Sequence, residues 1–126
     1  MFVTFIQIGI GGAIGAMLRY AVGVAAARHL AASGFPLGTI MVNVLGSMIM
    51  GFFAVYATHR GIENLNPFVM AGVLGGFTTF SAFSLEAFAL YEKGEIALAV
   101  AYVAASVFCS IGALIAAVLV ARALWS

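Results

Sequence analysis

Residues 37–58 read LGTIMVNVLGSMIMGFFAVYAT, a stretch without a single charged side chain. A helix needs about 20 predominantly apolar residues to cross about 30 Å of hydrocarbon, and this stretch is long enough to do so. Three more stretches that are similarly apolar occupy residues 3–27, 67–91 and 96–121. The sequence therefore predicts one domain over residues 1–126 that contains four membrane-spanning helices.

The composition of the whole chain indicates the same environment. Of the 126 residues, 65% are hydrophobic and 7% are charged, whereas a soluble domain is about half apolar and about a quarter charged. Five basic and four acidic residues cannot cover a water-facing surface. A net charge of +1 without a basic cluster also excludes a nucleic-acid binder that works by neutralising phosphates. We expect an all-α integral membrane protein that is surrounded by the lipid bilayer.

The basic residues of the connectors bear on how the chain is inserted. Four spans place both termini on one side of the membrane, together with Arg60 and Arg122, while Arg28 and Lys93 lie on the other side. Because basic residues normally mark the cytoplasmic side, this balance leaves the orientation undecided. We hypothesise that copies insert in both directions and pair as an antiparallel, dual-topology homodimer. A single fixed orientation is the alternative.

Glycines recur at four-residue spacing in two of the predicted spans. Gly11 and Gly15 do so in the first span, and Gly72 and Gly76 do so in the third. Small residues at this spacing let membrane helices approach closely. The contact that they predict can lie within one chain or between the two copies of a dimer.

Two charged residues fall inside the predicted spans, Arg19 in the first and Glu86 in the third. Charged side chains are costly at membrane depth, so they indicate function when they face the interior of a bundle. Both residues lie towards the same side of the membrane and could share a depth. Three arrangements follow: a buried pair, an Arg19 that extends to the interface, or an Arg19 that lines a watery vestibule and attracts anions.

The third span contains the most specific stretch, GVLGGFTTFSAFSLE at residues 72–86. Gly75 and Gly76, followed by the β-branched Thr78 and Thr79, are poor helix formers, so this pattern predicts a break in the span. A break frees backbone carbonyls, which protein, water or an ion must then satisfy. Free carbonyl oxygens suit a hard cation such as Na⁺. The alternative is a continuous helix with a contact lined by glycine.

Aromatic and hydroxyl side chains form two neighbouring stripes in the same span. They recur every three residues, as Phe77, Phe80 and Phe83 beside Thr78, Ser81 and Ser84. A phenyl ring is positive at its edge, so rings presented edge-on attract an anion weakly, and hydroxyls replace its lost water. Weak, repeated sites are what ion conduction requires. The alternative is that the phenylalanines face lipid or serve in packing.

Polar residues on the second and fourth spans also follow the helical period. Thr39 and Asn43 are four residues apart and share a face of the second span, and Tyr102, Ser106 and Ser110 share a face of the fourth. The Asn43 amide can hydrogen-bond either an anion or a neighbouring helix. The serines can satisfy their own backbone or form the second wall of a polar track.

These residues together resemble the Fluc (CrcB) family of fluoride channels, and the likeness covers essentially the whole chain. The matching motifs are Gly15-x-x-x-Arg19, Gly38-Thr39, Val42-Asn43-x-x-Gly46 and Gly75-Gly76-x-Thr78-Thr79-Phe80-Ser81-x-Phe83-Ser84-x-Glu86, with Tyr102, Ser106 and Ser110 in the fourth span. The resemblance implies a fluoride-selective channel in the bacterial inner membrane. It would act as an antiparallel homodimer and export fluoride passively from the cytoplasm, which relieves its toxicity.

The resemblance also implies a role for each matched residue. The expected fluoride pore comprises Asn43, Phe80, Phe83, Ser81, Thr39, Ser84, Tyr102, Ser106 and Ser110. Arg19 and Glu86 are expected in the vestibule or in gating. A structural Na⁺, which is not transported, would bind the backbone carbonyls of Gly75 and Thr78 at the dimer interface.

A proton-coupled exporter of the small multidrug resistance kind is the alternative function. Such coupling needs a carboxylate in the membrane, normally in the first span, and Glu86 in the third span is the only candidate here. The sequence shows no nucleotide-binding loop, no set of redox ligands and no nucleophile–base pair. We therefore do not expect an enzyme.

Overall fold

The computed structural model describes residues 1–126, apart from the side chain of Ala31. Four helical segments are long and apolar enough to cross a membrane, which confirms the predicted all-α membrane fold. The first, second and fourth spans are α1 (Phe2–Leu30), α2 (Leu37–Arg60) and α5 (Ile96–Trp125). The third span consists of η3 (Pro67–Leu74), the short α3 (Gly75–Phe77) and α4 (Ser81–Glu92), and the single turns η1 (Ala31–Ser33) and η2 (Glu63–Leu65) lie in the connectors.

The connectors are short because proline and glycine begin and end the helices sharply. Pro36 precedes α2 and Pro67 begins η3, where the missing N–H costs no helical bond. Gly61 ends α2 in the left-handed conformation, at φ 68°, and its N–H donates back to the last turn. The first two helices end at Leu30 and Arg60, which is two or three residues beyond the predicted span ends at 27 and 58.

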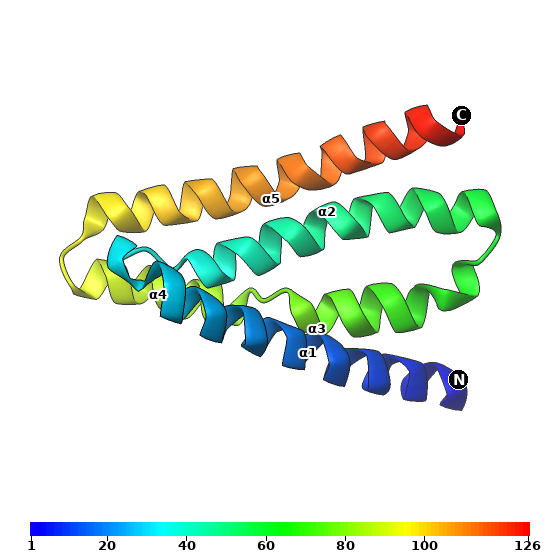
Figure 1. Ribbon diagram of the computed structural model, residues 1–126, viewed down its shortest axis with the longest axis horizontal. Coiled ribbons are helices and arrows are strands. Elements are labelled where there is room, and N and C mark those ends of the chain that lie inside the picture. Colours follow the sequence, from blue (N-terminus) through cyan, green and yellow to red (C-terminus); the bar gives the residue numbers. More distant parts are fainter.

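Figure 1 shows the four spans side by side, with both chain ends at the same end of the bundle. The helix α5 packs along α2, and α1 packs against η3 and α3 on the other side. The third span thus lies between α1 and the α2–α5 pair. A small core of Phe83, Leu90, Ala99 and Tyr102 joins α4 to α5.

The predicted glycine contact lies within the chain, between α1 and the third span. A Cβ added at Gly15 would collide with the Val73 carbonyl oxygen, and one at Gly76 would come within 2.6 Å of the Gly12 carbonyl oxygen. A Cβ at Gly72 would lie 2.9 Å from the Gly11 Cα. These glycines serve contact within one chain, so they carry no argument for a second subunit.

The third span is broken, as predicted, but the glycines are not the break. Gly75 has helical angles, at φ −63° and ψ −38°, and the helix continues to Phe77. Thr78 is extended, at φ −85° and ψ 160°, and helix resumes only at Ser81. The predicted break therefore falls at the threonines of the predicted segment and not at its glycines. Glycine permits the close approach to α1, and the β-branched Thr78 takes the extended backbone, in the stretch without helix that Figure 1 shows between α3 and α4.

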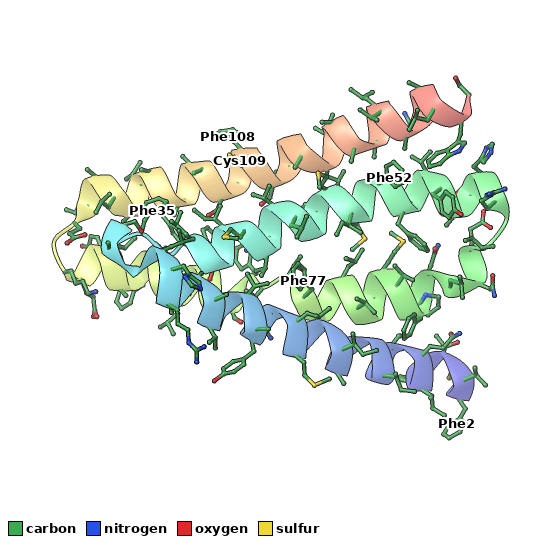
Figure 2. All side chains as sticks on the ribbon, viewed as in Figure 1. Phe2, Phe35, Phe52, Phe77, Phe108 and Cys109 are labelled. Carbon is green, nitrogen blue, oxygen red and sulfur yellow. The ribbon has the colours of Figure 1, made fainter. Side chains whose placement is uncertain are left out.

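The outward faces of the helices are apolar, as the lipid environment requires. Phe2 is 78% exposed on α1 and Phe108 is 76% exposed on α5. Figure 2 shows Phe108 and Cys109 on the outer side of α5, and Phe77 between the third span and α2. Phe77 is buried at the end of α3.

Substituting Gly15 by alanine tests the contact between α1 and the third span. The added methyl group has no space beside Val73, so we expect the free energy of unfolding in detergent to fall by about 1–3 kcal/mol. Gly9→Ala is the matched control, because a Cβ at Gly9 meets nothing within 4 Å. This control should be neutral or stabilising by up to about 1 kcal/mol. Equal losses in the two variants would contradict the contact.

Candidate functional site

Asn43 holds the break in the third span from the neighbouring helix α2. Its Nδ2 donates to the Thr79 carbonyl at 2.9 Å, and its Oδ1 accepts from the Thr79 N–H at 2.7 Å. Because the backbone of Thr79 presents one carbonyl acceptor and one N–H donor, the side-chain amide of Asn43 can satisfy both in only one orientation. An amide has two N–H donors, so one remains beyond this pair. The expected contact with a neighbouring helix is present, and a donor is left for a further ligand.

Two other side chains also bond to the backbone around the break. Thr79 Oγ1 accepts a hydrogen bond from the Ala82 N–H at 3.2 Å and so caps the first turn of α4. Arg19 reaches across from α1, where its Nε donates to the Gly76 carbonyl at 3.0 Å. The break is therefore held by residues from three spans.

These bonds leave two carbonyl oxygens without the donors that a continuous helix would supply. In an α-helix, the N–H of each residue donates to the carbonyl four residues before it. The Thr79 N–H, which would serve Gly75, goes to Asn43, and the Ala82 N–H, which would serve Thr78, goes to Thr79 Oγ1. The oxygens of Gly75 and Thr78 thus fit a hard cation chemically, since Na⁺ takes neutral oxygen ligands.

A cavity of about 590 Å³ lies between the break and α5. The rings of Phe80 and Phe83 meet edge to face at its wall, with centroids 5.4 Å apart at 72°. Phe83 is buried and packs against Tyr102, whereas Phe80 is 77% exposed in the single chain. The two rings therefore occupy different environments, although three-residue spacing put them in one stripe.

Two serine hydroxyls of α5 line the same cavity and have no hydrogen-bond partner among the described residues. They belong to Ser106 and Ser110, and both oxygens are shielded from solvent in the single chain. A buried hydroxyl without a partner costs about 1–3 kcal/mol. Such groups call for a ligand or water, and hydroxyl hydrogens can donate to an anion.

A second cavity, of about 450 Å³, lies on the other side of the break between the end of α1 and the start of α2. Arg19 and Glu86 both line it, so the two charged residues share a depth as expected. The Glu86 carboxylate accepts from Thr39 Oγ1 at 2.9 Å and from the Tyr102 hydroxyl at 2.7 Å. Since Arg19 bonds to Gly76 instead, the two do not form the buried pair.

Comparison with known proteins identifies the family. The family model described as CrcB-like protein, Camphor Resistance (CrcB), matches residues 6–118. The chain is 52% identical over 122 residues to a protein of Ruegeria sp. (strain TM1040) that is named fluoride-specific ion channel FluC, with 97% of each chain covered. Proteins of the same name from Roseobacter denitrificans and Paracoccus denitrificans are 54% and 49% identical over 123 residues, with 97–98% of each chain covered.

The chain belongs to the CrcB family. Its four spans and its relatives make it a multi-pass bacterial membrane protein. The resemblance read from the motifs is thereby confirmed for the whole chain. The comparisons assign no residue of the site, so the roles expected for individual side chains stay predictions.

The structure of this CrcB-family chain brings most of the expected pore residues to the two cavities. Asn43, Phe80, Phe83, Ser106 and Ser110 line the larger one, and Thr39 lines the smaller one with Arg19 and Glu86. Tyr102 lies buried between Phe83 and Glu86.

The remaining two predicted pore residues lie outside this group. Ser81 and Ser84 are exposed in the single chain. The Ser84 hydroxyl donates to the Phe80 carbonyl within its own helix at 2.9 Å, so its proton is already used.

Sequence reasoning did not place Thr79 at the site, although its position there is central. Thr79 lines both cavities, and its peptide group and its hydroxyl are all bonded. The signal that could have found it is the pattern Thr79-x-x-Ala82 before a helix. A hydroxyl three residues before a helical N–H is typical of an N-terminal cap.

Substituting Tyr102 by phenylalanine tests the hydrogen bonds to Glu86. The change leaves the Oε2 atom of the half-buried Glu86 without its donor, so we expect the free energy of unfolding to fall by about 1–3 kcal/mol. Tyr91→Phe is the matched control, because Tyr91 is 59% exposed. Thermal unfolding in detergent measures both. Indistinguishable variants would argue against the bond.

Proposed function

We propose that the chain is a fluoride-selective channel that lets fluoride leave the bacterial cytoplasm passively across the inner membrane. The observation that carries this proposal is the larger cavity, which is lined both by the edge-to-face rings of Phe80 and Phe83 and by the hydroxyls of Ser106 and Ser110, which have no partner among the described residues. The relatives that cover nearly all of the chain are named fluoride-specific ion channels. A transport role, rather than an enzymatic one, agrees with this arrangement.

The chemistry of the cavity suits a small, strongly hydrated anion. Fluoride must exchange its water for other donors, and the free N–H of Asn43 and the serine hydroxyls can supply hydrogen bonds in succession. The ring edges add weak attraction without the tight binding that a buried lysine or arginine would give. A site of this kind lets the ion leave as readily as it enters.

Selectivity over chloride would follow from size and from hydrogen bonding. Chloride is larger and softer than fluoride, so a narrow passage between ring edges and hydroxyls rejects it. The smaller cavity would serve as the vestibule, where the charge of Arg19 attracts anions. The carboxylate of Glu86 already accepts two hydroxyl hydrogen bonds, and we propose that it orients Thr39 and Tyr102.

We further propose that two copies pair in antiparallel orientation around a structural Na⁺. In the single chain, Phe80 is 77% exposed at the pore wall, and Gly75 is also exposed. A second copy on this face would cover both. The carbonyl oxygens of Gly75 and Thr78 from each copy would then hold the ion, whose charge compensates backbone dipoles that lack donors.

Fluoride efflux from liposomes that contain the purified protein tests the channel, with chloride as the control anion. Phe80→Ile should lower fluoride flux by up to about tenfold, because an aromatic edge contributes about 0.5–1.5 kcal/mol. Phe108→Ile is the matched control: Phe108 has nearly the same exposure, at 76%, but lies on the outer side of α5. Its flux should equal that of the unaltered protein. Equal chloride and fluoride flux would refute selectivity.

The same assay separates the channel from a proton-coupled exporter. Coupling would depend on a proton gradient and on proton binding by the carboxylate of Glu86. Passive fluoride flux requires neither a proton gradient nor proton binding. Abolition of transport by Glu86→Gln, combined with intact fluoride flux in Phe80→Ile, would favour the exporter.

A tag at the C terminus tests the dual topology. We expect the tag to be accessible from both faces of the cell membrane, since two basic connector residues lie on either side. Adding two lysines after Trp125 should bias the chain towards one orientation. Accessibility from one face only, in the unaltered protein, would refute the antiparallel dimer.

A further inference from the structure

We propose that Thr79 is the positioning residue of the cation site: its hydroxyl, together with the hold of Asn43 on its peptide group, creates the free carbonyls of Thr78 and Gly75. The inference rests on the sodium site of the proposed function. It assigns the origin of that site to a side chain that does not itself bind the ion.

The Gly75 carbonyl is free because the Thr79 N–H points to another partner. That N–H lies four residues after Gly75 and would donate to it in a continuous helix. It donates to Asn43 Oδ1 instead, at 2.7 Å, and the Thr79 carbonyl accepts from Asn43 Nδ2 at 2.9 Å. The pair of bonds holds the peptide of Thr79 outside the helical path.

The Thr78 carbonyl is free for a second, independent reason. Its helical donor would be the Ala82 N–H, which donates to Thr79 Oγ1 at 3.2 Å. The first backbone bond that reaches from α4 to a residue before it is that from the Ser84 N–H to the Phe80 carbonyl, at 2.9 Å. The hydroxyl of Thr79 thus replaces the Thr78 carbonyl as the acceptor of the Ala82 N–H.

The neighbouring polar groups do not compete for these two oxygens. The Thr78 hydroxyl donates to the Leu74 carbonyl at 2.9 Å, and Arg19 donates to the Gly76 carbonyl. Carbonyl oxygens without a donor are costly at membrane depth, and the cost falls when a cation binds them. The oxygens of Gly75 and Thr78, the residues expected to hold Na⁺, are thus among those left without a donor, together with the Phe77 carbonyl, which the Ser81 N–H would serve in a continuous helix.

Two substitutions at position 79 separate its hydroxyl from its shape. Thr79→Val keeps the β-branched side chain, which favours the extended backbone, but removes the acceptor of the Ala82 N–H. That N–H should then turn to the Thr78 carbonyl and extend α4 by a turn. Thr79→Ser keeps the hydroxyl and should behave as the unaltered protein does. Thr79→Ala serves as a second variant without the acceptor if the valine variant does not assemble.

Carbonyl NMR with residue-pair labelling reads the two oxygens separately. A ¹³C carbonyl at residue 78 and ¹⁵N at residue 79 isolate one peptide, because Thr78-Thr79 is the chain's only Thr–Thr pair. Gly–Gly labelling reports Gly75, with Gly11-Gly12 as the internal reference. Each signal is followed in proteoliposomes while Na⁺ replaces N-methyl-D-glucamine.

In the unaltered protein and in Thr79→Ser, the signals of both Thr78 and Gly75 should shift with Na⁺, and Gly11 should not. In Thr79→Val, the Thr78 shift should be lost while the Gly75 shift persists. The Na⁺ concentration for half of the Gly75 shift should then rise at least about tenfold, because each copy loses one ligand.

An undiminished Thr78 shift in Thr79→Val would overturn the positioning role. Absence of both shifts in the unaltered protein would overturn the sodium site and this inference with it. Fluoride flux measured on the same liposomes decides the channel function separately, so the failure of one is distinguishable from the failure of the other.

Discussion

Every backbone N–H and carbonyl at membrane depth needs a partner from the protein, water or an ion, because hydrocarbon offers none. The third span departs from the helical pattern over Thr78–Phe80, and side chains from other spans compensate. Asn43 from α2 bonds both polar groups of the Thr79 peptide, and Arg19 from α1 bonds the Gly76 carbonyl. The break is therefore a property of the assembled bundle, since no local segment could stabilise it alone.

The same constraint places the functional groups. Because helix resumes at Ser81, Phe80 and Phe83 stand at the start of α4, where one ring is exposed at the break and the other is buried against Tyr102. The two cavities lie on either side of this point, and Thr79 lines both of them. The residue that stabilises the irregular backbone thus also lies between the vestibule and the passage that we propose for fluoride.

Helical periodicity alone predicted much of the site. Residues four apart share a face, so Thr39 and Asn43 both reach the third span, and Ser106 and Ser110 line one cavity. The same rule was less informative where the helix is interrupted: three-residue spacing correctly brought the rings of Phe80 and Phe83 together, but it did not show that one is exposed and the other buried. Spacing also could not show that the Ser84 hydroxyl bonds its own helix.

The sequence by itself determined that the chain crosses the membrane four times and that its third span is irregular, because apolar length and poor helix formers are local properties. Its motifs also identified the family. Only the tertiary structure decided where the irregularity falls. Gly76 lies within a helical segment and lets the backbone of α1 approach closely, whereas Thr79 lies outside the helix with both of its backbone polar groups bonded to Asn43. Both outcomes depend on partners more than thirty residues away in the chain, which local propensity cannot encode.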